Sequence, residues 1–156
     1  MDTRYVLDTD TVAVLHFVNQ NGEPFSYDLK RELAFSDATL MRDMEGQPAK
    51  YAWWTSVLER ARIKMKQSED ALDYVKASVS NQVRAEGLVK TVAAVTDAVI
   101  VNDNYQEALA TLRYWQGEVD MLSYVVKSFE QRERMLMQKS AQLRKSMAND
   151  SNRPVM

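Results

Sequence analysis

The chain has 156 residues and no cysteine, which excludes a disulfide framework, thiolate metal sites and a cysteine nucleophile. Apolar residues make up 46 % of it, enough to bury the core of one domain. The formal net charge of −2 predicts no general attraction to nucleic acid, and no apolar run approaches the roughly 20 residues that a membrane span requires.

The charges are distributed unevenly along the chain. Residues 1–47 hold four Lys or Arg against nine Asp or Glu, whereas residues 127–147 hold six basic residues against two acidic ones. An acidic head and a basic tail are a hint of binding to a polyanion or to a protein partner.

The first 35 residues predict an N-terminal β-hairpin that forms the acidic head. The segments Thr11–Val18 and Phe25–Leu29 are rich in β-branched and aromatic residues, and Asn21-Gly22 lies between them. Pro24 suits an edge strand or the start of a strand. Because an isolated hairpin is marginal in water, we expect it to pack on the helices or on another copy of itself.

Helical segments follow the hairpin. Ser36-Asp37 can cap a short helix that runs to about Glu45, and Gly46-Gln47-Pro48 then interrupts the chain. The proline suits the first turn of a new helix. This first long helix is predicted over residues 48–86, with Gly87 as its stop.

A second long helix completes the predicted fold. Thr91 can cap a shorter helix through about Val101, and Asn102-Asp103 can begin a helix that reaches about Met147. We therefore expect residues 36–148 to form a long helical hairpin with a short intervening helix, and residues 149–156 to form a flexible tail.

Apolar side chains recur at steps of three and four along both long helices. Such steps place them on one helical seam, which must be buried against another helix. The fold class is therefore mainly α, a coiled-coil-like antiparallel hairpin of long helices. The seam positions are Tyr51, Trp54, Leu58, Ala61, Met65, Ser68, Leu72, Val75 and Val79 in the first helix, and Tyr105, Ala108, Leu112, Trp115, Val119, Leu122, Val126, Phe129, Leu136 and Leu143 in the second.

Two helices alone leave too much apolar surface exposed, so we expect a homo-oligomer. Met121, Val125 and Met135 flank the second seam, and Trp53 lies beside the first. These four residues are the candidate oligomer interface.

Few residues suit catalysis. The sequence has one histidine, His16, and it has neither a Gly-x-Gly-x-x-Gly motif nor a phosphate loop ending in Gly-Lys-Ser/Thr. We therefore expect no enzyme, no metal site and no cofactor.

Basic residues are the stronger functional pattern. If the seams pair Tyr51 near Leu143, position 62 lies close to position 132, and cations from both helices merge into one basic band. Such a band can neutralise phosphates, and arginines can stack on exposed bases. The candidate DNA-binding residues are Arg60, Arg62, Lys64, Lys66, Lys76, Lys127, Arg132, Arg134, Lys139, Arg144 and Lys145. The alternative is a solvated face whose cations pair with Glu59, Glu69 and Asp70.

Several segments between Gln47 and Met147 resemble phage proteins of the UvsY-like recombination mediator group. These segments are Gln47–Trp54, Lys90-Thr91, Asn104–Ala108, Leu112–Trp115 and Val126–Arg132 followed by Leu136. The resemblance implies a small helical accessory protein that forms a ring-like oligomer and binds single-stranded DNA. It also implies that the protein helps a recombinase to displace single-strand binding protein, in the host cytoplasm if the chain is phage-encoded.

The chain departs from that family at one position. The resemblance implies a DNA-contacting Lys-x-Arg pair late in the first long helix, and the counterpart here, Lys76-Ala77-Ser78, lacks the arginine. The acidic hairpin is not part of the family pattern either.

Two other functions stay open. The chain could be a phage-encoded adaptor or inhibitor that binds a protein and no nucleic acid, as the acidic hairpin and Trp53 suggest. Long helical hairpins also build virion components.

Overall fold

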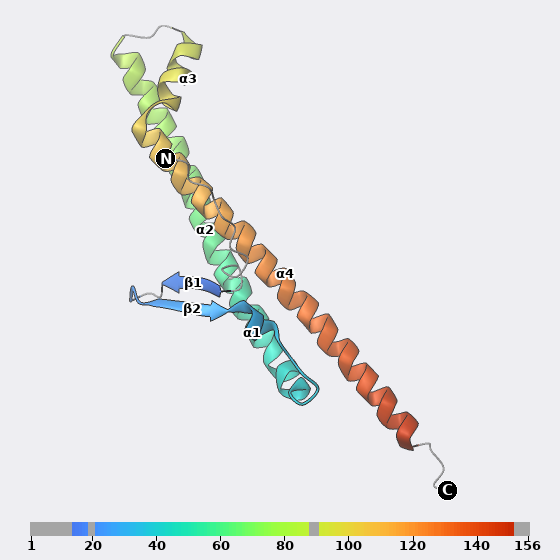
Figure 1. Ribbon diagram of the computed structural model, residues 1–156. Helices are drawn as coiled ribbons and strands as arrows, with labels where there is room; N and C mark the ends of the chain where they lie inside the picture. The colour runs from blue at the N-terminus through green and yellow to red at the C-terminus, as the bar shows by residue number, and fades with distance from the viewer. Residues whose placement is uncertain (1–13, 19–20, 88–90, 152–156) are drawn as a thin grey trace, which may run out of the picture. The chain divides into compact units, whose positions relative to one another are not determined.

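The computed structural model describes residues 14–18, 21–87 and 91–151 (Figure 1). Its elements are the strands β1 (Val14–Val18) and β2 (Pro24–Asp28) and the helices α1 (Leu29–Leu33), α2 (Leu40–Ala85), α3 (Val92–Ile100) and α4 (Asp103–Ser151). The long helices α2 and α4 pair antiparallel, which confirms the predicted fold class. None of the described helices combines the length and apolar character needed to cross a membrane. Residues 11–13 of the predicted first strand and residues 152–156 of the predicted tail lie outside the described residues.

The chain divides into two compact units. The terminal unit comprises residues 1–47 and 128–156, and the central unit comprises residues 48–127. Both long helices contribute to both units, so the division falls within the helices and not at the predicted boundaries after residues 35 and 148.

The terminal unit contains the predicted β-hairpin. β1 and β2 are antiparallel, with Leu15 opposite Tyr27 and Phe17 opposite Phe25. This register puts the four apolar side chains on one face of the hairpin, since alternate residues of a strand share a face. Leu15 is buried, and the Phe17 and Phe25 rings stack with centroids 5.5 Å apart. Gly22 has a φ of +80°, as expected for the glycine of the turn.

One helix of the terminal unit was not predicted. β2 ends at Asp28, where the predicted strand continued to Leu29, and α1 begins directly after it. The Asp28 carboxylate caps α1 by accepting a hydrogen bond from the Arg31 backbone N–H at 3.0 Å. An aspartate at the end of a strand-like run was the available signal.

The predicted helix break at Gly46–Pro48 is wrong, because α2 runs without interruption from Leu40 to Ala85. Pro48 provides no backbone N–H for the Met44 carbonyl, a defect that costs a helix interior about 3 kcal/mol. Packing just before the proline offsets this defect. Gln47 is 4 % exposed, and its amide donates to the Phe129 carbonyl at 2.7 Å.

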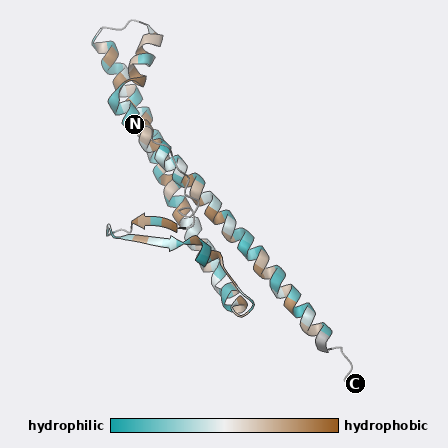
Figure 2. Ribbon diagram, in the orientation of Figure 1, coloured by the Kyte–Doolittle hydropathy of each residue, from teal (hydrophilic) through white to brown (hydrophobic). Residues whose placement is uncertain are grey.

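The central unit buries the predicted seams. Trp54, Leu58 and Ala61 of α2 are each at most 4 % exposed, and Leu112 and Leu122 of α4 are buried as well. Figure 2 shows brown apolar residues interspersed with teal polar ones along both helices, as expected for helices that bury one face.

The chain reverses at Gly87, before α3. Gly87 has a φ of +67° and ends α2, as predicted. Thr91 then caps α3 by accepting from the Ala94 N–H at 3.3 Å. Val95 and Val99 of α3 form a buried cluster with Val79 of α2. Within the central unit, α3 is therefore the first part of the returning arm, beside the end of α2 (Figure 1).

This reversal changes the predicted helix register. The expected pairing of Tyr51 with Leu143 treated the short helix as part of the turn. In the structure, Arg132 contacts Asp43 and Gln47, so position 132 lies opposite positions 43–47 and not opposite position 62. The predicted merger of the Arg62 and Arg132 regions is therefore wrong.

The start of α4 agrees with the sequence, and its end lies further on. The Asn102 side chain accepts from the backbone N–H groups of Asn104 and Tyr105 at 3.0 and 3.3 Å, as a helix cap. The helix continues past Met147 to Ser151, into the predicted tail.

Candidate nucleic-acid interface

Two cations of the central unit are already paired with carboxylates. Arg62 donates to Glu59, and Lys66 lies 3.2 Å from Glu69 and 3.4 Å from Asp70. Glu69 and then Asp70 raise the pKa of the Lys66 ammonium. These two residues therefore follow the solvated-face alternative, and their charges are balanced locally.

Arg60 and Lys64 differ from these two cations. They are exposed, and among the residues that the structure describes neither forms an ion pair. The sequence explains why: no Asp or Glu lies three or four positions from either residue. At about 100° per residue, Arg60 and Lys64 share one face of α2, and Arg62 and Lys66 lie about 200° around the helix from them. Of these two faces, the one with Arg60 and Lys64 carries the cations that are not in ion pairs among the described residues.

A groove of about 340 Å³ opens beside Lys64, between α2 and α4 of the central unit. Its lining residues are Lys64, Gln67, Ser68 and Ala71 of α2 and Ala108, Thr111 and Trp115 of α4. Small side chains at the seam positions 68 and 108 cannot fill the space between the helices. Sequence reasoning missed this groove, although small residues at facing seam positions were the signal.

The hydroxyl groups of the groove donate to their own helices. Ser68 Oγ bonds the Lys64 carbonyl at 2.9 Å, and Thr111 Oγ1 bonds the Glu107 carbonyl at 3.0 Å. The Lys64 ammonium and the Gln67 amide have no partner among the described residues. These two groups are the polar donors that the groove offers to a ligand.

The other predicted cations of the central unit are exposed and stand apart from this groove lining. Lys76 is exposed on α2. Lys127 lies over the Tyr124 ring, with its Nζ 5.6 Å from the centroid, and Tyr124 is itself 69 % exposed. A cation held on an aromatic face remains open to a phosphate from the solvent side.

Arg132 does not belong to the cationic surface, and the prediction that it binds DNA is wrong. Its side chain is 2 % exposed and lies inside the terminal unit. The guanidinium donates to the Leu33 carbonyl at 3.1 Å and to the Gln47 side chain, and it pairs with Asp43 at 3.1 Å. A phosphate cannot reach it, because protein acceptors occupy its fork of donors.

Arg132 and Thr39 also set the protonation state of Asp43. A hydrogen bond from Thr39 Oγ1, 2.6 Å long, lowers the pKa of the Asp43 carboxyl, and the positive charge of Arg132 lowers it further. Partial burial opposes this shift. Asp43 is thus held as a carboxylate that faces Arg132.

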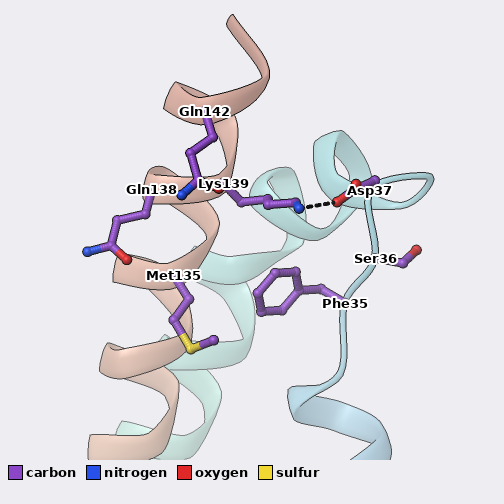
Figure 3. A pocket seen from close by; sticks show the side chains of 7 residues that line it. All are labelled: Phe35, Ser36, Asp37, Met135, Gln138, Lys139 and Gln142. Atoms are coloured by element: carbon purple, nitrogen blue, oxygen red, sulfur yellow. Dashed lines mark ion pairs between the residues drawn. The ribbon is translucent and has the colours of Figure 1, made fainter. Parts of the chain in front are cut away.

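The remaining predicted cations of the terminal unit differ in whether they are free to bind a phosphate. Arg134, Arg144 and Lys145 are exposed, whereas Lys139 pairs with Asp37 at 3.0 Å. Figure 3 shows the Lys139 ammonium meeting Asp37 above the Phe35 ring, with Met135 on the α4 side. The surrounding groove of about 340 Å³ is lined by Phe35, Ser36, Asp37, Met135, Gln138, Lys139 and Gln142.

The four candidate interface residues differ in their exposure to solvent. Met135 is 55 % exposed, and Met121 is half-buried. Trp53 is half-buried and packs edge-to-face on Trp54, with centroids 4.7 Å apart. Val125 is only 3 % exposed, so its assignment to an oligomer interface is wrong. The buried face of α4 is wider here than one seam position, because Val125 and Val126 are both inside.

Comparison of the chain with family models, curated proteins and solved structures finds no match.

Proposed function

We propose that the chain binds single-stranded DNA through its central unit and acts as an accessory protein that assists recombinase loading in phage recombination. DNA binding is proposed because two exposed cations, Arg60 and Lys64, have no ion-pair partner among the described residues. Both lie on the face of α2 that reaches the groove. The resemblance to UvsY-like proteins supplies the recombination part.

The chemistry of this pair suits a phosphate backbone. A lysine or arginine without a carboxylate neighbour can release the counterions of a phosphate without first breaking an ion pair. Two such contacts per chain give weak binding, and several copies on one strand would strengthen it through effective concentration. Contacts of this kind carry no sequence preference.

Binding is tested by fluorescence anisotropy with a labelled oligodeoxythymidine over a range of salt concentrations. The test variant is Arg60→Gln/Lys64→Gln, and the control variant is Arg62→Gln/Lys66→Gln. Both variants remove two positive charges from neighbouring turns of one helix, so a general field effect would weaken both equally. We expect the test variant to bind less tightly and with a shallower salt dependence, by about 0.7 in log–log slope for each lost phosphate contact.

Two results would contradict DNA binding by this face. One is the absence of any binding by the unmodified protein at low salt, which would favour the protein-directed adaptor. The other is an equal loss of affinity in the test and control variants.

Recombinase loading has a separate test. The protein is added to single-stranded DNA that is coated with single-strand binding protein, and the rate of recombinase filament formation is measured. Acceleration supports the mediator role. DNA binding without acceleration would remove that role and leave the DNA-binding proposal intact.

A further inference from the structure

We infer that the groove beside Lys64 is a nucleobase subsite, in which one base of single-stranded DNA stacks on Trp115 while the adjoining phosphate meets the Lys64 ammonium. The inference rests on the proposed function. It adds that the groove holds a nucleobase of the bound strand.

The walls of the groove suit a flat apolar ligand. Trp115 is half-buried and contributes the aromatic ring of the lining, and the small side chains of Ala71 and Ala108 line the same groove. The Ser68 and Thr111 hydroxyls donate to backbone carbonyls of their own helices, so neither needs an acceptor from the ligand. The volume of about 340 Å³ lies at the low end of small-ligand sites, which span roughly 300–1,000 Å³. One base with its sugar matches this size.

The polar groups of the groove suit a polynucleotide. Lys64 brings a positive charge to the rim with no carboxylate to balance it, and Arg60 extends this charge about 6 Å along α2, one helical turn away. The Gln67 amide can both donate to and accept from a base edge. Since every base has a π face and an edge that an amide can meet, the subsite would tolerate all four bases.

The arrangement also favours single strands over duplex. A base must leave its stack to place a face on Trp115, and an unpaired base does so at lower cost than a paired one. Single-stranded DNA should therefore bind more tightly than duplex of the same length.

The experiment blocks the groove without removing any charged or core residue. Ala71 is exposed and lines the same groove as Trp115, so Ala71→Met places a longer side chain in the groove. The matched control is Ala110→Met, an exposed alanine on the opposite face of α4. Anisotropy is measured with two labelled probes of equal length, oligodeoxythymidine and an abasic oligodeoxyribose phosphate.

We expect the unmodified protein and the Ala110→Met control to prefer the base-containing probe by about tenfold or more, the scale of one stacked base. Ala71→Met should lose this preference and keep its affinity for the abasic probe. Trp115→Leu should behave like Ala71→Met, and Trp115→Phe should restore part of the preference, because a phenyl ring still stacks.

The outcomes separate the subsite from the proposed function. Equal affinity of the unmodified protein for both probes would overturn the subsite and leave phosphate binding in place. An equal preference in Ala71→Met and Ala110→Met would overturn it too. If neither probe bound, the proposed function itself would fail.

Discussion

At the scale of single residues, Arg132 shows that a buried cation stabilises the fold and does not bind an external anion. A buried guanidinium is tolerated only when acceptors satisfy it, and here the Leu33 carbonyl, Gln47 and Asp43 do so. The sequence did contain a signal for this position. Residue 132 lies three positions after Phe129 and four before Leu136, so it falls on the buried face of α4.

Replacing Arg132 should destabilise the terminal unit. Arg132→Gln leaves Asp43 without its buried partner, and the loss of one member of such a pair costs about 3–5 kcal/mol. The measurement is urea unfolding followed by circular dichroism. The control is Arg134→Gln, an exposed position two residues away, where the change should stay within about 0.5 kcal/mol. Similar stability of the two variants would contradict the role of Arg132.

Asp43 should make the protein sensitive to acid. Its pKa is lowered in the folded chain from an ordinary value of 3.8, because Thr39 and Arg132 favour the carboxylate. A carboxyl group with a lowered pKa stabilises the fold above its ordinary pKa, and this stabilisation is lost as the pH falls through the lower, folded value. The free energy of unfolding should therefore decline below about pH 4.

The variant Asp43→Asn isolates this contribution. It cannot ionise, so it should be less stable than the unmodified chain at neutral pH and should lose less stability on acidification. Unfolding curves collected between neutral and acidic pH test the point. Parallel profiles for the two proteins would show that Asp43 does not contribute.

At the scale of elements, the seams and caps were predictable and the register was not. The alternation of three and four steps identified most of the buried residues of α2 and α4 but missed others, among them Gln47, Val125 and Arg132. Thr91, Asn102 and Gly87 marked ends where the structure has them. These signals are local. The register depends on which side of the reversal α3 packs, and that follows from its contact with Val79, which no local pattern encodes.

Gly87, just after α2, and Gly117, inside α4, should respond to alanine in opposite directions. Gly87 has a φ of +67°, so Gly87→Ala forces an L side chain into the left-handed region at a cost of about 1–2 kcal/mol. Gly117 lies inside α4, and Gly117→Ala should stabilise the helix by up to about 1 kcal/mol. An added Cβ meets no atom within 4 Å at either position, so neither effect contains a clash. Thermal unfolding of the pair tests the prediction, and shifts of the same sign would contradict it.

At the scale of the whole molecule, the charge pattern was a poor guide to which cations a ligand can reach. Counting charges along the sequence separates an acidic head from a basic tail. The pairing of Arg62 and Lys66 follows the solvated-face alternative, which the spacing of acidic neighbours on α2 indicated. The pair of Lys139 with Asp37 joins residues far apart in the sequence, so local spacing could not show it. The groove beside Trp115 also needed the pairing of two helices to become visible.

The chain should self-associate. Large side chains remain exposed in both units, among them Tyr74 and Tyr114 at 76 % and 59 % and Met135 and Met137 at 55 % and 52 %. Light scattering should give a mass that is a multiple of 17.9 kDa, and added oligodeoxythymidine should increase it. A mass of one chain at every concentration, with and without the oligonucleotide, would contradict the prediction.

The discontinuity of the terminal unit has a consequence for biosynthesis. The ribosome delivers residues 48–127 as one contiguous stretch, whereas the first 47 residues must wait for Arg132 before their carbonyl groups find its guanidinium. The central unit can therefore mature first, and the head would stay incomplete until about the last sixth of the 156 residues is translated. A released chain that ends at residue 127 would thus contain a folded central unit and a head that proteases can still cut.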